Sequence, residues 1–307
     1  MLQGRWARPL LIALVAALAL YVAALAQSDL DAVTAALRRI GLPTALWGGL
    51  LCTAAILFRF LRWQLLLACF GRTPPWRTSL AIYWAGIALT WTPGKVGETL
   101  RSLLLKPHGV RVPDSLAAFL ADRLSDVIGV ALLGLIAAAC AGVETRLFIA
   151  IVGLGGIASL AVAAWVRRGH LPERWRLIAP LRAWAPLWTP TRLPVWVGLG
   201  GLAYGVQAAV FGLFAQTVSP ELGLAACIAA FSAALFVGAA SMLPAGLGAM
   251  EATLAFALTR MGATWEDAVA ATLLTRLCTL WIPSGLCLLV LPTLVRSTPA
   301  PLSTAQA

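Results

Sequence analysis

The sequence has few charged residues and few residues suited to catalysis or metal binding. Only 11% of its 307 residues are Asp, Glu, Lys or Arg, and it has two histidines. Soluble domains usually carry about 25% charged residues. The six cysteines lie within apolar runs, with no Cys-X-X-Cys pair and no histidine at ligand spacing. We therefore expect no metal site, no soluble domain able to act alone, and packing roles for the cysteines.

Recognisable cofactor and catalytic motifs are also missing. No nucleotide-binding loop is visible, so we expect no cofactor, and without a catalytic motif we expect no enzyme. The net charge of +11 would suggest nucleic acid for a soluble protein. The basic residues lie between apolar runs, however, where they would meet anionic lipid headgroups. The expected partner is therefore membrane lipid and not nucleic acid, and the oligomeric state is left open.

Long apolar runs dominate what is present. The chain is 61% hydrophobic, with a mean hydropathy of +0.88. A spanning helix needs about 20 apolar residues. The sequence therefore predicts an all-α polytopic membrane protein with one transmembrane domain over 1–297 and a disordered tail over 298–307. The predicted spans are 9–26, 44–69, 114–141, 145–166, 194–218 and 265–293.

Two further apolar stretches, 78–106 and 223–260, are interrupted near their middle. Pro93-Gly94 breaks the first, and Pro244-Ala245-Gly246 breaks the second. The halves are short for complete spans. We interpret the stretches as two re-entrant helical hairpins. An arrangement in which each stretch crosses the membrane twice, with ten spans in all, places every other segment on the same side and stays open. The predicted half-helices are 78–91, 95–106, 225–242 and 249–260.

Basic residues are unevenly distributed between the two predicted sides of the membrane. With the N-terminus in the cytoplasm, 15 basic residues fall inside, among them Arg59 and Arg62, and 4 fall outside. This asymmetry follows the positive-inside rule and places both termini in the cytoplasm. Residues 2–27 imitate a signal peptide, but the long apolar run predicts a retained first span. The connection 167–192, rich in Arg, Trp and Pro, is expected to lie along the headgroups.

The two interrupted stretches look like copies of one unit. Glu98 precedes Arg123 by 25 residues, and Glu251 precedes Arg276 by the same spacing. In the six-span arrangement the two arginine-bearing spans run in opposite directions. We therefore predict an inverted-topology repeat, with units at about 44–141 and 194–293, of the kind in which transporters place a site near the midplane.

Eight charged residues are predicted at membrane depth, where each ionised group costs about 2.5–3.5 kcal/mol on insertion scales. They must therefore face one another or a wet cavity. Two interpretations stay open: structural ion pairs that brace the hairpins, or the lining of a cavity for a charged headgroup. The residues are Lys95, Glu98, Arg101, Asp122, Arg123, Asp126, Glu251 and Arg276.

The first break is a candidate anion site. A helix that restarts after Pro93-Gly94 presents unpaired backbone N–H groups and a positive dipole end. Lys95 adds a full charge there, and Arg101 lies about two turns further on. Arg59 and Arg62 either anchor the second span at the interface or help to gather a lipid phosphate.

These segments resemble one known family. Arg59-Phe-Leu-Arg62-Trp63, Pro93-Gly-Lys-Val-Gly-Glu98, Ala121-Asp122-Arg123-Leu-Ser-Asp126 and Pro244-Ala-Gly-Leu-Gly-Ala-Met-Glu251 are similar to motifs of the lysylphosphatidylglycerol synthase transmembrane-region family. The similarity extends from about 10 to 293. Asp122 stands where the family pattern suggests Glu. The resemblance implies a bacterial inner-membrane lipid translocase, and the sequence lacks the soluble aminoacyl-transferase domain that performs synthesis.

The resulting hypothesis is a flippase-like transporter of an anionic phospholipid or lipid-linked glycan. Lys95, Arg101 and the backbone at Gly94 would hold the phosphate. Glu98, Glu251, Arg123 and Arg276 would form ion pairs that switch partners. Two alternatives remain: a non-transporting accessory protein of envelope lipid or polysaccharide synthesis, and a membrane transferase for polyprenyl-phosphate sugars with a divalent metal at Asp122 and Asp126.

Overall fold

The fold is helical and contains several helices long enough to cross a membrane. The computed structural model describes residues 29–88, 100–168, 179–287 and 289, and these contain no strand. Five of their helices have the length and hydropathy of membrane spans. They match five of the six predicted runs and confirm a polytopic all-helical membrane protein. They are α3 (Leu42–Ala68), α6 (Val112–Ala141), α7 (Arg146–Arg167), α9 (Leu193–Val218) and Trp265–Cys287.

The last of these spans changes its winding part-way along. It begins as α12 (Trp265–Arg276) and continues as the π-helical segment η5 (Leu277–Trp281). Such π segments are rare and often lie at functional sites. The predicted span 9–26, the signal-like residues and the tail 298–307 lie outside the described residues.

Proline and glycine set several helix boundaries. Pro43, Pro113 and Pro194 occupy the first turns of α3, α6 and α9, where a missing N–H costs nothing. Gly142 ends α6 with a φ of 66°, a left-handed conformation that suits glycine. Local backbone geometry at these proline and glycine residues therefore explains where the helices begin and end.

A short helix that is not among the predicted elements, α2 (Leu30–Ile40), precedes α3. Asp29 caps it by accepting a hydrogen bond from the Asp31 N–H at 2.9 Å. Val33, Ala36 and Ile40 repeat at helical spacing and are buried. This apolar face packs α2 against α9 and α12.

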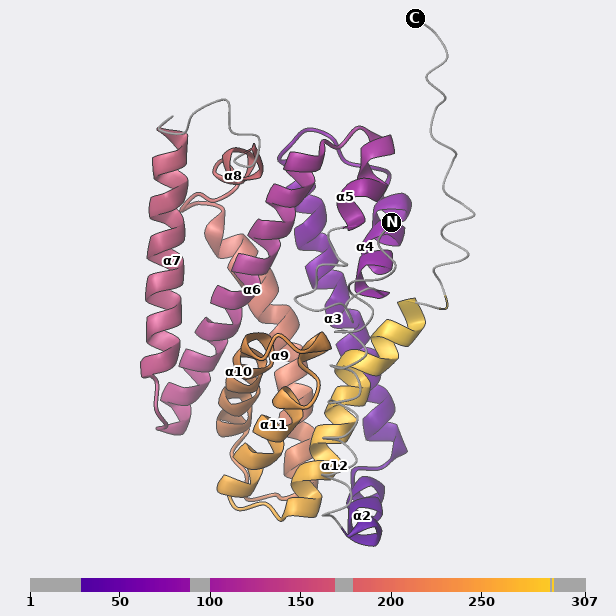
Figure 1. Ribbon diagram of the computed structural model, residues 1–307. Coiled ribbons are helices and arrows are strands. Elements are labelled where there is room, and N and C mark those ends of the chain that lie inside the picture. Colours follow the sequence, from indigo (N-terminus) through magenta and orange to yellow (C-terminus); the bar gives the residue numbers. More distant parts are fainter. Residues whose placement is uncertain (1–28, 89–99, 169–178, 288, 290–307) are drawn as a thin grey trace, which may run out of the picture.

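The second interrupted stretch forms two helices, as predicted. α10 (Leu224–Ala240) and α11 (Ala249–Arg260) pack against each other, with the 3-10 turn η4 (Pro244–Gly246) between them. In the first stretch, α4 (Trp76–Ala88) and α5 (Leu100–Leu105) also pack together, and the 3-10 turn η2 (Lys106–His108) follows. The break predicted at 92–95 lies outside the described residues. Figure 1 shows α10 and α11 in the lower half of the bundle and α4 and α5 in the upper half.

The backbone between α10 and α11 adopts conformations that most residues avoid. Met242 and Ala245 have φ values of 54° and 52°, in the left-handed region that non-glycine residues rarely occupy. A side chain at Gly246 would meet the Gly238 Cα at 3.0 Å. The sharp reversal at Pro244-Ala245-Gly246 therefore brings the turn directly against α10.

Helices α6 and α9 cross at a point of close backbone approach. A Cβ added to Gly129 would lie 2.9 Å from both the Gly201 N and the Val197 O. Small residues allow this packing within membranes, where lipid gives helices little hydrophobic reason to associate. By contrast, Leu154 and Ile157 on α7 are each 73% exposed. Exposed apolar side chains of this kind suit a lipid-facing helix.

The connection to α9 packs more deeply than predicted. In its described part, α8 (Ala179–Trp184) packs on α6, and Trp184 stacks on Trp188 with ring centroids 5.6 Å apart. The Trp188 indole donates to the Ser159 hydroxyl at 2.7 Å. Both tryptophans are buried. These two tryptophans therefore fill a gap between helices, and the position of the connection along the headgroups stays a prediction.

The two ends of the bundle differ in charge. At the upper end in Figure 1, where α3 and α7 end and α6 and α9 begin, the described residues carry one acidic residue, Asp114, and many basic ones. At the opposite end acidic residues outnumber basic ones. The upper basic residues are Arg72, Arg77, Lys106, Arg111, Arg167, Arg168, Arg182 and Arg192. The lower charged residues are Arg38, Arg39, Arg146 and Arg260 with Asp29, Asp31, Glu144, Glu221, Glu266 and Asp267.

Candidate functional site

Arg62 on α3 lies at the centre of a buried ion-pair group. Its side chain has no exposed surface. The Arg62 Nε donates to Asp122 Oδ1 at 2.8 Å, and its Nη2 donates to Asp126 Oδ1 at 2.5 Å. The two aspartates lie one turn apart on α6, so a single guanidinium reaches both, as their shared face predicted. Gly200 on α9 makes room, because any side chain there would overlap the Arg62 guanidinium.

This placement corrects one sequence interpretation. Arg62 and Trp63 are both buried inside the bundle and are not interface anchors. Arg59 and Arg62 lie within α3, and both approach aspartates of α6.

Two further arginines complete what we call the arginine–aspartate cluster: Arg59, Arg62, Asp122, Arg123 and Asp126. Arg123 Nη2 lies 2.5 Å from Asp122 Oδ2 and 3.1 Å from Asp126 Oδ2. Arg59 is more loosely held, with its Nη2 3.6 Å from Asp126 Oδ2. Three arginines against two aspartates give the cluster a formal charge of +1.

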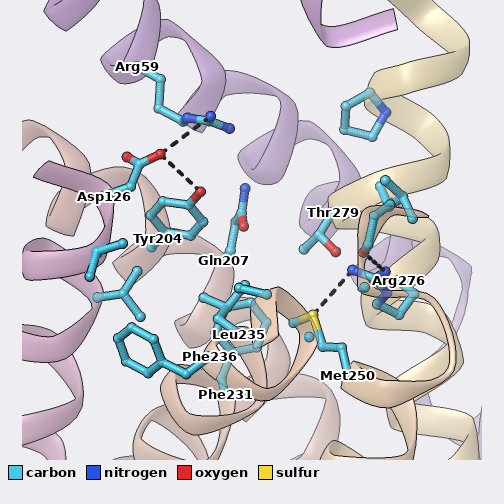
Figure 2. Close-up of a pocket in the computed structure, with 18 of the residues that line it drawn as sticks. Arg59, Asp126, Tyr204, Gln207, Phe231, Leu235, Phe236, Met250, Arg276 and Thr279 are labelled. Atoms are coloured by element: carbon cyan, nitrogen blue, oxygen red, sulfur yellow. Dashed lines mark hydrogen bonds and ion pairs between the residues drawn. The ribbon is translucent and has the colours of Figure 1, made fainter. Parts of the chain in front are cut away.

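Tyr204 on α9 contacts two members of this cluster, Asp126 and Arg59. Its hydroxyl donates to Asp126 Oδ2 at 3.3 Å, and the Arg59 guanidinium lies 5.5 Å from the centre of its ring. The ring face attracts a cation by its quadrupole. Tyr204 therefore helps to hold Arg59 in place without neutralising its charge (Figure 2).

Arg101 on α5 lies in an aromatic setting. Its guanidinium is 4.2 Å from the centre of the Tyr83 ring and 5.5 Å from that of Trp63. A side chain at Gly86 would overlap Arg101, so that glycine leaves the space which Arg101 fills. Arg101 is buried and does not line the cavity described below. Its predicted partners in anion binding, Gly94 and Lys95, lie outside the described residues, as does Glu98.

A second charged group braces the turn between α10 and α11. Arg276 Nε donates to Glu251 Oε1 at 2.6 Å, which pairs the two residues spaced by 25 in the sequence. Arg276 Nη2 donates to the Ala245 carbonyl at 2.9 Å, and its Nη1 lies 3.3 Å from the Met250 sulfur. Glu251 Oε2 accepts the Gly248 N–H at 2.7 Å. These contacts hold the left-handed turn residues in place.

A cavity of about 430 Å³ lies between the two charged groups. The arginine–aspartate cluster contributes Arg59, Arg123 and Asp126 to one side, and Arg276 lies at the other side, next to the η4 turn. Figure 2 shows Gln207 between these groups and an apolar floor below. The floor includes Phe231, Leu235 and Phe236. The cavity therefore combines a basic wall with a hydrocarbon-like surface.

The structure sorts the predicted site residues into those that line the cavity and those behind it. Arg59, Arg123, Asp126 and Arg276 line it. Arg62, Asp122 and Glu251 are buried behind these residues and hold them. The pair Asp122 and Asp126, considered above as metal ligands, instead binds the guanidinium groups of Arg62 and Arg123. These carboxylates bind cations of the protein itself and do not fit a divalent metal ion.

Sequence reasoning missed Tyr204 and Gln207, which both line the cavity. A usable signal was present, because both are polar residues inside the predicted span 194–218. Polar residues within spans are costly and usually face the bundle interior. Both side chains are uncharged, so a search for charged residues at membrane depth does not find them.

Comparison with known proteins agrees with the motifs and the fold. The family model described as "Lysylphosphatidylglycerol synthase TM region" matches residues 9–287. The chain belongs to this family. A search of curated proteins found no match. Membership of the lysylphosphatidylglycerol synthase transmembrane-region family makes this a lipid-related membrane protein, and the match covers every residue that lines the cavity.

Proposed function

We propose that the protein is a flippase-like transporter that moves an anionic phospholipid or a lipid-linked glycan across the bacterial inner membrane. One observation carries the proposal: a cavity between two buried charged groups, with a basic wall and an apolar floor. A lipid presents the matching pair of surfaces, a charged headgroup and hydrocarbon. The family supports the lipid connection in general terms.

Arg59 is the residue best suited to the headgroup phosphate. Arg62 and Arg123 already contact both aspartates at 2.5 to 3.1 Å, whereas Arg59 contacts Asp126 at 3.6 Å. The surplus positive charge of the cluster is thus directed toward the cavity through Arg59. Guanidinium groups bind phosphate oxygens through paired N–H donors, and this geometry gives strong and specific contacts. Lys95 and the Gly94 backbone stay part of the proposed anion site.

The proposed transport movement uses the interrupted helices. We infer that 78–106 and 223–260 are re-entrant hairpins of an inverted repeat, which enter the bilayer from opposite sides. Rocking of the two halves would open the cavity to one leaflet at a time. Ion pairs such as Glu251–Arg276, and its expected counterpart Glu98–Arg123, would exchange partners during this movement. Protonation of Glu98 or Glu251 is the proposed coupling step.

The proposed orientation places the basic end of the bundle in the cytoplasm, together with both termini. Short loops rich in Lys and Arg favour that side. In this orientation α4 and α5 enter from the cytoplasm, and α10 and α11 enter from outside. The proposed partner is membrane lipid, and the proposed activity is transport without covalent chemistry.

Leaflet transfer in reconstituted vesicles tests the proposal. Fluorescent anionic lipid is placed in the vesicle membrane, and its accessibility to an external quencher is followed over time. Wild-type protein should move the lipid faster than protein-free vesicles do. Arg59→Gln should reduce the rate to near the protein-free level, since it removes the headgroup charge contact and leaves both aspartates paired.

Arg192→Gln provides the matched control. Arg192 lies outside the cavity and donates to the Pro186 carbonyl at 3.1 Å. Its loss should leave the transfer rate unchanged. Equal transfer by wild type and Arg59→Gln would remove the proposed role of Arg59, and no transfer by the wild type would remove the proposed transport.

A second candidate is a non-transporting accessory protein. It is favoured because the buried arginines already direct their hydrogen-bond donors to groups of the protein. Arg62 and Arg276 both direct their donors to protein groups, as structural braces do. This function predicts that neutralising Glu251 lowers the melting temperature but leaves leaflet transfer at the protein-free level in wild type and variant alike. The transferase alternative has no comparable observation in its favour.

A further inference from the structure

Arg59 on α3 has a hydrogen-bond donor that the protein does not use in this structure. Its side chain is 13% exposed, and its buried Nε has no acceptor among the described residues. The Nε atoms of Arg62 and Arg276, by contrast, each donate to a carboxylate, at 2.8 and 2.6 Å. A buried donor on a charged group is costly to leave without a partner, so the Arg59 Nε calls for an explanation.

Tyr83 on α4 has a second buried polar group without a partner. The residue has no exposed surface, and its hydroxyl makes no hydrogen bond within the part of the chain that the structure describes. Buried tyrosine hydroxyls usually find a partner. Tyr204 does so, because its hydroxyl donates to Asp126 Oδ2 at 3.3 Å. Of these two tyrosines, Tyr83 is therefore the one whose hydroxyl is unused.

The Tyr83 ring is fixed against α3 close to Arg59. Its centre lies 5.6 Å from that of Phe60 in an edge-on arrangement and 6.2 Å from that of Trp63. The Arg101 guanidinium lies 4.2 Å from the ring centre. Phe60 directly follows Arg59 in the chain, and Tyr83 interacts electrostatically with the Arg59 guanidinium. Two groups that each lack a hydrogen bond thus lie near each other, on two helices that pack together.

Tyr83 lies behind Arg59 and does not line the cavity. Arg59 lines it, as does Ile87, which follows Tyr83 by one turn on α4. A ligand in the cavity would therefore act on Tyr83 through Arg59. The distance of 3.6 Å from Arg59 Nη2 to Asp126 Oδ2 is longer than an ordinary hydrogen bond (Figure 2). This contact is weak enough for a ligand to replace it.

We propose that Tyr83 is a positioning residue for Arg59, whose Nε donates to the Tyr83 hydroxyl when an anionic group in the cavity draws the guanidinium away from Asp126. A guanidinium binds a phosphate through two of its five N–H donors, so another is available to the protein. A phenol oxygen accepts such a bond. The pairing satisfies both unused groups at once and holds the remaining donors of Arg59 toward the cavity.

The exchange leaves no carboxylate without a cation. Asp126 stays paired with Arg62 at 2.5 Å and with Arg123 at 3.1 Å after Arg59 departs. One weak contact is lost, and one hydrogen bond between buried groups is gained. The inference rests on the proposed function in taking the cavity as a site for an anionic lipid, and it adds that lipid binding changes the partner of Arg59.

Lipid binding to the purified full-length chain in detergent micelles tests this role. The probes are fluorescent phosphatidylglycerol and a fluorescent polyprenyl phosphate, which represent the two lipid classes proposed. Tyr83→Phe removes the hydroxyl and keeps the ring. It should weaken binding of the lipid that the wild type binds by about tenfold, as expected for one lost hydrogen bond to a charged group. Unchanged affinity in Tyr83→Phe overturns the inference.

The melting temperature without added lipid separates this role from a structural one. Tyr83→Phe should leave it unchanged or raise it, because the hydroxyl has no partner to lose. Tyr204→Phe is the matched control and should lower it, because that hydroxyl bonds to Asp126. A Tyr83→Phe protein that melts lower than the wild type, or does not fold, would contradict the unused hydroxyl and overturn the inference.

A double-mutant cycle with Arg59→Lys tests which atom of Arg59 is involved. Lysine keeps the positive charge but has no Nε–H at this position. Tyr83→Phe should therefore have no further effect on lipid affinity in the Arg59→Lys background. A tenfold loss in both backgrounds would mean that the hydroxyl acts without Arg59, which is inconsistent with the proposed pairing.

Failure of the inference and failure of the proposed function give different results. Lipid binding that depends on Tyr83, without leaflet transfer in the vesicle assay, would contradict the transporter proposal and support the positioning role. Leaflet transfer by the wild type, with equal lipid affinity in Tyr83→Phe, would support the transporter and remove the role of Tyr83. A wild type that binds neither lipid would overturn both.

Discussion

Among single residues, the buried arginines that donate hydrogen bonds to carboxylates of the protein hold the fold together. Arg62 is the clearest case, because it contacts both aspartates of α6 from within α3. Buried ion pairs often add little net stability over apolar packing, but removal of one partner leaves an uncompensated charge. The same logic applies to Arg276 at the second break.

Replacement of Arg62 should therefore be severely destabilising. We expect Arg62→Met to lower the free energy of unfolding by about 3–5 kcal/mol, because Asp122 Oδ1 and Asp126 Oδ1 lose their guanidinium donors inside the bundle. Thermal or denaturant unfolding in detergent micelles measures this. The matched control is Arg146→Met, at an exposed pair with Glu144, where the cost should stay below about 1 kcal/mol. Similar stabilities of the two variants would contradict the central role of the cluster.

At the element scale, close helix packing and sharp turns decide where the side chains meet. The crossing of α6 and α9 at Gly129 and Gly201 brings Asp126 within reach of Tyr204. A bulkier residue at this crossing would separate the two helices that form one wall of the cavity. The break between α10 and α11 plays a comparable part, because it places the η4 turn at the opposite wall.

A pair of glycine substitutions tests the crossing. A Cβ at Gly129 meets backbone atoms, which cannot move aside, whereas nothing lies within 4 Å of a Cβ at Gly153 on α7. We expect Gly129→Ala to destabilise the protein by about 1–3 kcal/mol through overpacking. Gly153→Ala should be neutral or stabilising, since alanine is the better helix former. Unfolding in micelles compares the two, and equal effects would be inconsistent with this packing.

At the scale of the whole molecule, the charge difference between the two ends predicts orientation in the membrane. Cys69 and Cys140 are natural reporters, because both are exposed and lie at opposite ends of the bundle. The basic end carries Cys69. The positive-inside rule therefore places Cys69 in the cytoplasm and Cys140 outside.

Thiol labelling checks this orientation in intact cells. A membrane-impermeant maleimide should label Cys140 directly, and Cys69 only after permeabilisation. Cys140→Ser should abolish labelling of intact cells, and Cys69→Ser should abolish the additional labelling. The four buried cysteines should react in neither case. Labelling of Cys69 in intact cells would reverse the proposed orientation.

Five of the six predicted spans, the break in the second interrupted stretch and the presence of buried charges could all be predicted from the amino-acid sequence. Hydropathy and proline act locally, so length and pattern suffice to place them. The partners of those charged residues could not be predicted in the same way. Arg62 was open to interpretation as an interface anchor, and Gln207 passed unnoticed, because neither has a neighbour in sequence that reveals its surroundings.

The packed structure was needed to show that α3, α6 and α9 meet around one ion-pair cluster, and that Gln207 and Arg276 line the same cavity. These arrangements join residues 60 or more positions apart: Arg62 contacts Asp122, and Gln207 lines the same cavity as Arg276. They depend on helix crossings that are set by a few glycines at the points of closest approach. A contact of that kind is a property of the packed helices together, and no single segment encodes it.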